Sequence, residues 1–391
     1  MTKRVLYLEH CTDGTIGGSH FCLLEICHHI DRVQFEPVVC FFEANVLVGE
    51  FKKIGLEVLI LQLPGRWSAP ALLPRSFGRL LEFGVNIVLT LGVRTVRWMR
   101  VLRELKIDIV HINNACGYDH DLMLACRLSG RPCVVHQRGI ESNLNRRTRY
   151  FANHVNCIIA ISDAVSVNLL NQGINKKKII RIDDGIDESR FAQQESDEAV
   201  RKRLGIAEDS PVIGIVGNIK HWKGQHVVVE AVGSLLRSFS KLRCLFVGSI
   251  VDRQYYNQLL MRAKEIGIQE CALIFTGYEA RPADLMRVMD VVIHASVEPE
   301  PFGIVLLEAM GAARPLIATN IGGPKEIVVS GKTGLLVPPG DVLALTMAVK
   351  QLLFNPEDAR CMGELGRARY YERYTIQKTI AAIELQYQKL S

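Results

Sequence analysis

Short apolar, β-branched runs alternate with helix-length amphipathic segments along all 391 residues, and this alternation most constrains the fold. Continuous apolar runs of about four to eight residues are typical of strands buried on both faces of a parallel sheet. Parallel strands are joined by long crossovers, usually helices, so the pattern predicts layered α/β structure. The predicted strands are residues 4–8, 37–42, 57–61, 108–112, 132–137, 157–161, 178–182, 212–217, 243–247, 272–276, 290–294, 315–319 and 334–337.

Two segments begin alike, which predicts two domains. RVLYLEH leads through GTIGGSH into a helical pattern over residues 21–30, and VIGIVGNIK leads through HWKGQ into one over residues 226–239. A strand, a glycine-containing loop and a helix in succession are typical of the start of a doubly wound domain. Ligands of such sheets bind at the carboxyl ends of the strands, so we expect a cleft between two facing sheets.

The chain exceeds the roughly 100–200 residues typical of one domain. The polar segment 183–210 is the expected connection. We therefore predict an N-terminal domain over residues 1–182, a C-terminal domain over 183–370, and a terminal helix over 371–391 that docks back on the first domain.

Cysteine usage and hydropathy predict a cytoplasmic protein. The 11 cysteines are scattered without a Cys-x-x-Cys pair, which fits a reducing compartment better than a disulfide framework or a zinc ribbon. The opening apolar run is too short for a signal peptide. The longest apolar stretch, residues 80–99, carries Glu82, Arg94 and Arg97, so a membrane span is not expected.

Charge is uneven along the chain, which raises the question of an anionic partner. Residues 1–182 hold 23 Lys and Arg against 15 Asp and Glu, whereas residues 183–391 hold 24 against 26. No nucleic-acid-binding signature is present, so a membrane surface is the favoured partner for the basic half.

The segment 75–106 concentrates this positive charge. From Arg94 its arginines recur every third residue between Val93, Val96, Trp98, Met99, Val101 and Leu102. This pattern predicts an interfacial helix in peripheral contact with an anionic membrane. The alternative is an ordinary packed helix with a solvated arginine face.

The most informative motif is EPEPFGIVLLEAMG at residues 298–311. Two prolines fix a loop, and a helix is expected to begin at Gly303. The first backbone N–H groups of that helix, at Phe302, Gly303 and Ile304, lack intrahelical acceptors and favour an anion such as phosphate. Glu300 and Glu308 can accept hydrogen bonds from sugar hydroxyls. The motif therefore predicts a site for a phosphorylated sugar.

The second motif, VGNIKHWKGQ at residues 216–225, places Lys220 and Lys223 between a strand and a helix. Lysine is a compact charge suited to phosphate, although a solvated basic turn is the simpler interpretation of one such residue. The third motif, Gly17-Gly18, lacks a complete G-x-G-x-x-G and an acidic residue after the second strand, which disfavours a dehydrogenase.

With IAISDAV, IDDGID and TNIGGPKEIVVSGKTGLLVPPGD, these motifs resemble glycosyltransferase family 4, whose members are retaining, nucleotide-sugar-dependent enzymes of the GT-B fold. The resemblance implies an α/β protein with two Rossmann-like domains. It assigns Glu300 to the donor sugar, Glu308 to the ribose and Lys223 to the diphosphate. It places Gly17 and Gly18 at the diphosphate and acceptor.

Two positions depart from the family pattern. Asn218 stands where the family usually has Arg, and Lys220 can replace its charge. Arg138 stands where the family tends to have a catalytic His, with His136 two residues earlier on the same strand face. Either the role moves to His136, or Arg138 acts electrostatically; a core position for His136 is an equal alternative. No Asp-x-Asp pair suits a catalytic metal, so we predict metal-independent catalysis without a cofactor.

The sequence thus predicts a retaining transferase that moves a hexose-type sugar from a UDP- or GDP-sugar to a glycan or lipid-linked acceptor in cell-surface polysaccharide biosynthesis. A nucleotide-sugar 2-epimerase of the same fold is the first alternative, because it binds the same donor without an acceptor. A non-catalytic nucleotide-binding regulator is the second.

Overall fold

The computed structural model describes residues 2–10, 18–65, 67–68 and 75–390. They form two compact units, Met1–Asp183 with Thr379–Ser391 (unit 1) and Asp184–Lys378 (unit 2). The division falls one residue after the boundary expected from the sequence. The segment 371–391, expected as one terminal helix, is shared between the two units.

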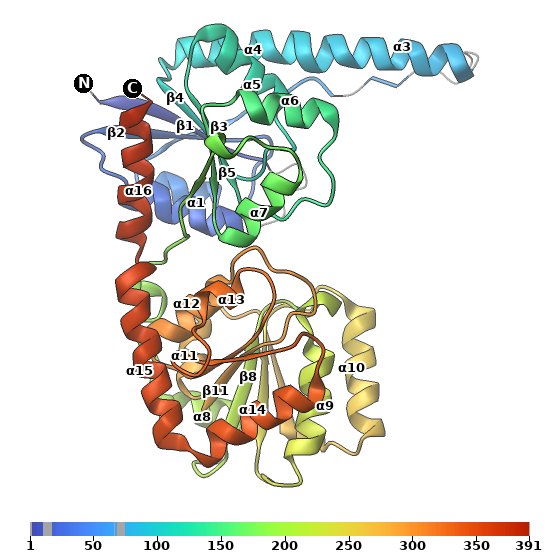
Figure 1. Cartoon of the computed structure of the whole chain (residues 1–391), viewed down its shortest axis with the longest axis vertical. Coiled ribbons are helices and arrows are strands. Elements are labelled where there is room, and N and C mark those ends of the chain that lie inside the picture. Colours follow the sequence, from blue (N-terminus) through green and yellow to red (C-terminus); the bar gives the residue numbers. More distant parts are fainter. Residues whose placement is uncertain (1, 11–17, 66, 69–74, 391) are drawn as a thin grey trace. The chain divides into compact units, whose positions relative to one another are not determined.

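Unit 1 is built on a sheet of seven parallel strands in the order β3-β2-β1-β4-β5-β6-β7. Every strand predicted in this half is present, with ends that differ by at most two residues. The central strands are buried on both faces because helices flank the sheet on both sides (Figure 1). The strands are β1 (Lys3–Glu9), β2 (Phe35–Phe41), β3 (Glu57–Ile60), β4 (Ile109–Ile112), β5 (Cys133–Gln137), β6 (Cys157–Ala160) and β7 (Ile179–Arg181).

The helices of unit 1 follow the strands as crossovers. Several start with a side-chain cap, such as Ser162, whose hydroxyl accepts a hydrogen bond from the backbone N–H of Val165. The helical segments are α1 (Gly18–His29), α2 (Val48–Lys53), α3 (Arg75–Ile87), the π-helix η1 (Val88–Val93), α4 (Arg94–Glu104), α5 (His120–Ser129), α6 (Arg146–His154), α7 (Asp163–Asn171) and the short η2 (Lys176–Lys178).

Unit 2 repeats the plan with six parallel strands in the order β10-β9-β8-β11-β12-β13. All six were predicted within one residue. The core lies between this sheet and its helices and includes Val228, Phe246 and Ile293. The strands are β8 (Val212–Val216), β9 (Arg243–Val247), β10 (Leu273–Gly277), β11 (Val291–His294), β12 (Leu316–Thr319) and β13 (Leu335–Val337).

The helices of unit 2 include the one predicted to begin at Gly303, whose first helical residue is Ile304. The segments are η3 (Glu188–Arg190), α8 (Asp197–Leu204), η4 (His221–Lys223), α9 (Gln225–Leu235), α10 (Arg253–Glu265), η5 (Glu270–Ala272), α11 (Pro282–Arg287), α12 (Ile304–Gly311), α13 (Pro324–Ile327), α14 (Val342–Phe354) and α15 (Pro356–Arg373). Helix α16 (Ile376–Lys389) follows α15 and ends within unit 1.

The end of α16 packs into the core of unit 1 through buried side chains. Tyr387 is fully buried, and its hydroxyl lies 2.5 Å from Nδ1 of His111 and 3.0 Å from the hydroxyl of Tyr7. Its ring packs edge-on against Phe35 at 5.3 Å. The C-terminal residues are therefore part of the core of unit 1, although Tyr387 and His111 lie 276 residues apart in the sequence.

The arginine-rich segment of unit 1 forms one continuous helix in which α3, η1 and α4 follow each other without a break (Figure 1). The expectation that Trp98 and Leu102 belong to an exposed apolar surface is wrong: both are buried, at 0% and 1% exposure, because α4 packs against α5. Val88, Val93 and Val96 do remain exposed. None of the helices in the described residues combines the length and the apolar character needed to cross a membrane.

Candidate active site

The two residues that the sequence singled out in different motifs of unit 2 are in contact. The ammonium group of Lys223 donates to both carboxylate oxygens of Glu300, at 3.0 and 2.9 Å. The same ammonium lies 4.2 Å from the centre of the Trp222 ring. Lys223 ends η4, the first helical turn after β8, and Glu300 lies in the loop after β11, the neighbouring strand. The carboxyl ends of parallel strands meet at one edge of a sheet, and this edge is where α/β sheets bind ligands.

Glu300 has two further partners that fix its charge. Oε2 of Glu300 lies 2.6 Å from Nε2 of His294 and accepts a hydrogen bond from the Ser296 hydroxyl at 3.0 Å. Burial alone would raise the pKa of the Glu300 carboxyl, but His294 and Lys223 together hold this pKa well below its usual range. Glu300 is therefore ionised at every physiological pH. Because an ionised carboxylate only accepts hydrogen bonds, Nε2 of His294 carries the proton and donates it.

Glycines allow the loops that carry these side chains to approach closely. A Cβ atom on Gly224 would lie 1.9 Å from the carbonyl oxygen of Ala295, and one on Gly322 would lie 2.4 Å from that of Glu300. Both glycines also have positive φ angles, 75° and 65°. Side chains at these two positions would push apart the backbone segments that bring Lys223 and Glu300 together.

The start of α12 lies two residues beyond the glutamate loop. Gly303 is the N-cap with φ 125°, Phe302 before it is buried, and Ile304 opens the helix. As in any α-helix, the first backbone N–H groups have no acceptor within the helix. The Lys223 ammonium contacts Glu300, three residues before the N-cap Gly303, and both this ammonium and the start of the helix favour an anion.

Glu308 lies within α12 and is 5% exposed. Its Oε1 accepts two hydrogen bonds from the Arg190 guanidinium, from Nε at 2.9 Å and from Nη2 at 2.5 Å. Arg190 comes from the segment predicted only as a connection, so the sequence interpretation missed it. The two bonds fix the orientation of the Glu308 carboxylate through its Oε1 atom.

Asn218 and Lys220 follow β8 at the same edge. Asn218 is exposed, and its carbonyl oxygen accepts a hydrogen bond from the side chain of buried Gln225 at 3.0 Å. Lys220 is half-buried and precedes η4. Both residues are thus positioned by backbone contacts within the loop that carries Lys223.

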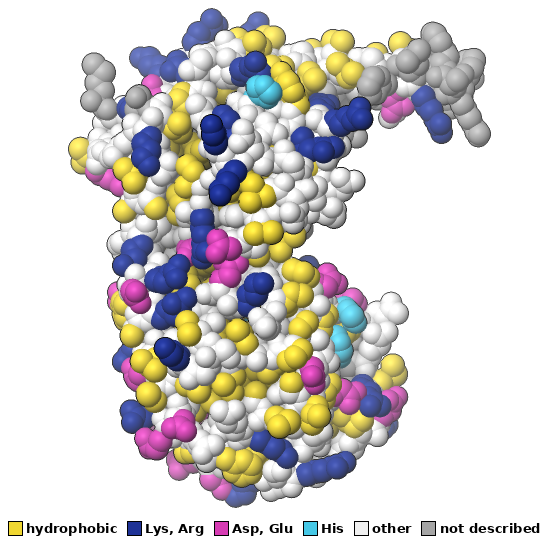
Figure 2. Space-filling model, in the orientation of Figure 1, with side chains coloured by type: hydrophobic (Ala, Val, Ile, Leu, Met, Phe, Trp, Pro, Cys, Tyr) yellow, Lys and Arg dark blue, Asp and Glu magenta, His cyan; other side chains and the backbone are white. Residues whose placement is uncertain are grey.

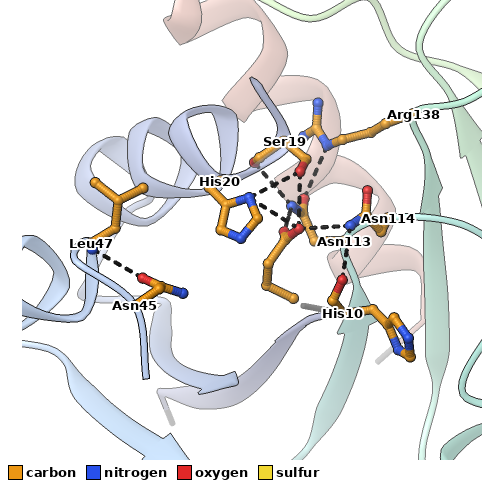
Figure 3. A network of polar contacts seen from close by, with 9 residues as sticks. His10, Ser19, His20, Asn45, Leu47, Asn113, Asn114 and Arg138 are labelled. Atoms are coloured by element: carbon orange, nitrogen blue, oxygen red, sulfur yellow. Dashed lines mark hydrogen bonds and ion pairs between the residues drawn. The ribbon is translucent and has the colours of Figure 1, made fainter. Parts of the chain in front are cut away.

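In unit 1 the predicted glycine loop lies partly outside the described residues, which exclude Gly17. Gly18 begins α1, and the next two residues, Ser19 and His20, point into a polar network that Figure 3 shows together with Asn113, Asn114 and Arg138. The network centres on Glu9, the last residue of β1, which is completely buried.

Glu9 is surrounded by neutral hydrogen-bond donors. The Ser19 hydroxyl donates to Oε1 at 2.9 Å, the Asn114 amide donates to the same oxygen at 2.7 Å, and the Asn113 amide donates to Oε2. Glu9 was not recognised from the sequence, although an acidic residue that ends an apolar strand is a visible signal. It holds the start of α1 and the loop after β4 together.

His136 and Arg138, the two alternatives for the catalytic role, lie on and just after β5. His136 is completely buried, and its Nδ1 lies 3.2 Å from Nε2 of His111 and 3.4 Å from Nη2 of Arg138. Burial, followed by the charge of Arg138, lowers the pKa of both histidines, that of His111 to about 3. Arg138 is half-buried and donates from Nε to Oδ1 of Asn113 at 3.2 Å.

A metal site is not evident in the part of the chain that the structure describes, where no group of three or more His, Cys, Asp or Glu side chains is arranged to hold an ion. The ionised side chains of the unit 2 site are instead paired with one another, Lys223 with Glu300 and Arg190 with Glu308.

Comparison with known proteins identifies the family. The family model described as "Glycosyl transferases group 1" matches residues 196–369, and that described as "Glycosyltransferase Family 4" matches residues 16–190. The chain belongs to the family 4, group 1 glycosyltransferases. The two matches divide the chain much as the two folded units do, and the first contains both Lys223 and Glu300.

Two mannosyltransferases are similar to this chain over most of its length. A GDP-mannose-dependent alpha-mannosyltransferase of Mycobacterium tuberculosis is 30% identical over 342 residues, which cover 83% of this chain and 81% of the relative. A GDP-mannose-dependent alpha-(1-6)-phosphatidylinositol monomannoside mannosyltransferase of Mycolicibacterium smegmatis is 32% identical, with 75% and 79% covered. The chain is thus a glycosyltransferase, which disfavours the epimerase alternative.

Solved structures show the same two-domain GT-B fold. The HepE protein of Anabaena in complex with UDP superimposes with a TM-score of 0.83 at 23% identity and covers 99% of this chain and 100% of that chain. A glycosyltransferase from Rickettsia africae gives a TM-score of 0.84 at 20% identity, with 100% and 98% covered. The predicted fold class is confirmed.

Proposed function

We propose that this glycosyltransferase transfers a hexose-type sugar, with retention of anomeric configuration and without a metal ion, from a UDP- or GDP-sugar to a glycan or lipid-linked acceptor in cell-surface polysaccharide synthesis. The observation that carries the proposal is the ionised Glu300 held by Lys223 and His294 at the sheet edge from which α12 starts. The relatives named above use GDP-mannose and the HepE structure contains UDP, which supports these two donor classes.

The donor diphosphate is assigned to Lys223 and the N-terminus of α12. A lysine ammonium has three N–H donors, and two of them go to Glu300, so the third remains for a phosphate oxygen. The backbone N–H groups at Phe302, Gly303 and Ile304 add the partial positive charge of a helix N-terminus, which attracts a phosphate. Asn218 and Lys220, with Gly17 and Gly18 from unit 1, are assigned to the same donor.

The two glutamates are assigned to hydroxyl groups. Glu300 accepts hydrogen bonds from the donor sugar, because its charge is fixed by its partners over the physiological pH range. Glu308 accepts from the ribose through Oε2, because Arg190 already occupies Oε1. Both carboxylates are held in place before the donor binds, which reduces the cost of ordering them during the reaction.

In the reaction, the bond between the anomeric carbon and the diphosphate oxygen breaks, and the acceptor oxygen forms the new bond on the same face of the sugar. The leaving diphosphate oxygen takes the acceptor's proton. Negative charge grows on the diphosphate, and Lys223 stabilises it; removal of such a group typically slows an enzyme about 10²–10³-fold. Arg138 is assigned an electrostatic role, and the buried, neutral His136 is assigned to positioning Arg138.

The helix formed by α3, η1 and α4 is proposed to contact an anionic membrane surface from which a lipid-linked acceptor is taken. Exposed Val88, Val93 and Val96 lie along the helix that also exposes Arg97 and Arg100. Figure 2 shows cationic and hydrophobic side chains together over this part of unit 1. Each basic residue near such a surface contributes about 1 kcal/mol.

Transfer of label tests the proposed reaction. Radiolabelled UDP-glucose, UDP-galactose, UDP-N-acetylglucosamine and GDP-mannose would each be incubated with the enzyme and a glycan and lipid extract, with and without EDTA. We expect one donor to label an acceptor equally in both conditions, with the anomeric configuration retained in the product by NMR. Conversion of a nucleotide sugar in the absence of acceptor would identify an epimerase instead.

Vesicle co-sedimentation tests the membrane contact. Binding to phosphatidylglycerol vesicles should weaken as salt rises, because screening shortens the reach of the arginine charges. Binding should be absent on neutral phosphatidylcholine vesicles. Equal, negligible sedimentation with both at low salt would exclude the membrane contact and indicate a soluble acceptor.

A further inference from the structure

Four completely buried polar side chains connect the C-terminal helix α16 with Arg138 through the core of unit 1. They are Tyr7 on β1, His111 on β4, His136 on β5 and Tyr387 on α16. The Tyr387 hydroxyl lies 3.0 Å from that of Tyr7 and 2.5 Å from Nδ1 of His111. Nε2 of His111 lies 3.2 Å from Nδ1 of His136, which lies 3.4 Å from Nη2 of Arg138. A continuous chain of polar contacts therefore joins the last helix to Arg138.

The two histidines of this chain lie in strands that are otherwise largely apolar. Residues 109–112 read IVHI and residues 133–137 read CVVHQ, and every one of these residues is buried. A buried polar side chain lowers stability unless its hydrogen bonds are made, whereas an apolar residue at the same place carries no such cost. The role of the two histidines therefore lies in their hydrogen bonds rather than in packing.

The direction of each hydrogen bond in the chain follows from the guanidinium at its end. A guanidinium only donates, so Nδ1 of His136 accepts from Arg138. Burial, followed by the charge of Arg138, lowers the pKa of both histidines, so each ring is neutral and carries one proton. Nε2 of His111 faces the Nδ1 acceptor of His136 and therefore carries the proton of His111. Nδ1 of His111 then accepts from the Tyr387 hydroxyl, whose oxygen accepts from Tyr7.

The Arg138 guanidinium contacts two acceptors whose own positions are fixed. Nη2 faces His136, and Nε donates at 3.2 Å to Oδ1 of Asn113, beside which Figure 3 shows the guanidinium. Asn113 is itself oriented, because its amide nitrogen donates to Oε2 of the buried Glu9. Hydrogen bonds in such a chain polarise one another in a core of low dielectric constant. The two acceptors together define the orientation of the guanidinium.

The Tyr387 hydroxyl decides which ring nitrogen of His111 carries the proton. Without this donor, the proton can move to Nδ1 of His111, and Nε2 becomes an acceptor. Two acceptors cannot share a hydrogen bond, so Nδ1 of His136 would then carry a proton and donate it to His111. That nitrogen would no longer accept from Arg138, and the guanidinium would lose this contact.

We propose that Tyr387 is a positioning residue for sugar transfer: its hydroxyl fixes the proton of His111, and through His136 it fixes the orientation of the Arg138 guanidinium. The inference rests on the proposed function, in which Arg138 acts electrostatically on the reaction. It gives a role in the reaction to the last helix of the chain, which was expected from the sequence only to dock on unit 1.

Tyr387→Phe tests the inference, because it keeps the buried ring and removes only the hydroxyl. In the label-transfer assay with saturating donor and acceptor, we expect kcat to fall about tenfold, the effect of one lost hydrogen bond. The donor KM should stay within about twofold of the wild-type value, because the donor contacts are unchanged. Tyr370→Phe is the matched control and should keep the wild-type kcat. It removes a buried hydroxyl of α15 that donates to the carbonyl of Ile186 at 2.8 Å.

Histidine tautomers report the positions of the protons independently of activity. Long-range NMR correlations of the ¹⁵N-labelled full-length protein should show His111 and His136 with the proton on Nε2 in the wild type. In Tyr387→Phe, a form of His111 with the proton on Nδ1 should appear. Tyr7→Phe removes only the donor to Tyr387, so it should lower kcat by a smaller factor, and it serves as the second variant if Tyr387→Phe does not fold.

Arg138→Ala separates a positioning role of Tyr387 from a purely structural one. In the Arg138→Ala background, Tyr387→Phe should lower kcat no further, because its effect passes through the guanidinium. An equal loss in both backgrounds, wild-type tautomers in Tyr387→Phe, or wild-type kcat in both tyrosine variants would each overturn the inference. If Arg138→Ala slows turnover and the tyrosine variants do not, only the inference fails. If Arg138→Ala turns over like the wild type, the role of Arg138 in the proposed function fails as well.

Discussion

The buried carboxylates of the two units differ in the partners that compensate their charge. In unit 2, each buried glutamate is paired with a cationic side chain, Glu300 with Lys223 and Glu308 with Arg190. In unit 1, Asp119 and Asp121, which flank the start of α5, each have a buried oxygen without a partner among the described residues. The difference indicates that the carboxylate charges of unit 2 are compensated by fixed cations, whereas those of the two unit 1 aspartates are compensated less fully within the described residues.

The largest effect is expected from Lys223→Ala in the site of unit 2. The change removes a charge that is proposed to stabilise the leaving diphosphate and leaves Glu300 with His294 and Ser296 only. We expect kcat/KM to fall about 10²–10³-fold. Steady-state kinetics would measure this, with Lys264→Ala on the exposed face of α10 as the control. Unchanged kcat/KM in Lys223→Ala would remove Lys223 from the mechanism.

Glu300→Gln is expected to slow turnover more than it weakens nucleotide binding. It keeps the shape of the side chain but removes the charge that His294 and Lys223 stabilise. Turnover should fall about 10–100-fold, the effect of losing hydrogen bonds to a charged group. The affinity for the bare nucleoside diphosphate, measured by calorimetry, should change much less. Equal losses in both would place Glu300 at the nucleotide and contradict its assignment to the sugar.

Arg190→Ala tests whether the pair with Glu308 organises the ribose site. Without the guanidinium, the Glu308 carboxylate loses both bonds to Oε1. The donor KM should rise about tenfold, with a smaller change in kcat, and Glu308→Ala should produce the same pattern. If Arg190 and Glu308 act only through their contact with each other, the double variant should raise the donor KM no more than either single variant does. Additive losses would show two independent roles.

The smallest effect is a difference in acid sensitivity between the units. His111 and His136 have lowered pKa values in the folded state, so their contribution to stability is complete above the unfolded pKa of about 6.5 and declines as pH falls toward the folded values, about 3 for His111. Glu300 also has a lowered pKa, so its contribution is complete above about 4.3 and is lost only below that.

As the pH falls from 7 to 5, only the two histidines of unit 1 among these three groups should therefore lower the free energy of unfolding. Each contributes a slope of at most about 1.4 kcal/mol per pH unit. Urea unfolding at several pH values would measure the slope, and His111→Gln should flatten it. A slope that is the same in His111→Gln would show that these histidines do not control acid stability.

Much of the fold could be predicted because strand burial leaves a local signal. All thirteen strands were found from apolar runs, and the helix after Gly303 from its glycine and proline residues. The break between α15 and α16 was missed, because it depends on a distant contact. Thr375 forms a parallel bridge with Ile186, and the backbone N–H groups of Ile186 and Ile376 donate to Tyr374 and Ile186, respectively.

The residues of the candidate site in unit 2 were singled out from the sequence by type, but their pairing was not predicted. Lys223 and Glu300 lie 77 residues apart, and their contact follows from the adjacency of β8 and β11, which no local pattern encodes. Arg190 carried no motif at all. The contact between His10 and Asp119 in unit 1 was missed for the same reason, because these residues lie 109 positions apart in the sequence. For Trp98 the prediction itself was wrong. The spacing of the arginines indicated an exposed apolar surface, but it does not reveal that the Trp98 ring is buried.

The central claim is that unit 2 binds a nucleoside diphosphate sugar through Lys223 and Glu308, and thermal unfolding across a panel of UDP- and GDP-sugars tests it most directly. A ligand that binds only the folded state at 100 times its Kd adds about 2.7 kcal/mol of stability, which corresponds to a shift of several degrees. We predict that one nucleotide class raises the Tm of the wild type, and that the Lys223→Ala/Glu308→Ala double variant, folded by circular dichroism, loses most of this shift. An equal shift in the double variant, or no shift with any nucleotide sugar, would contradict the account.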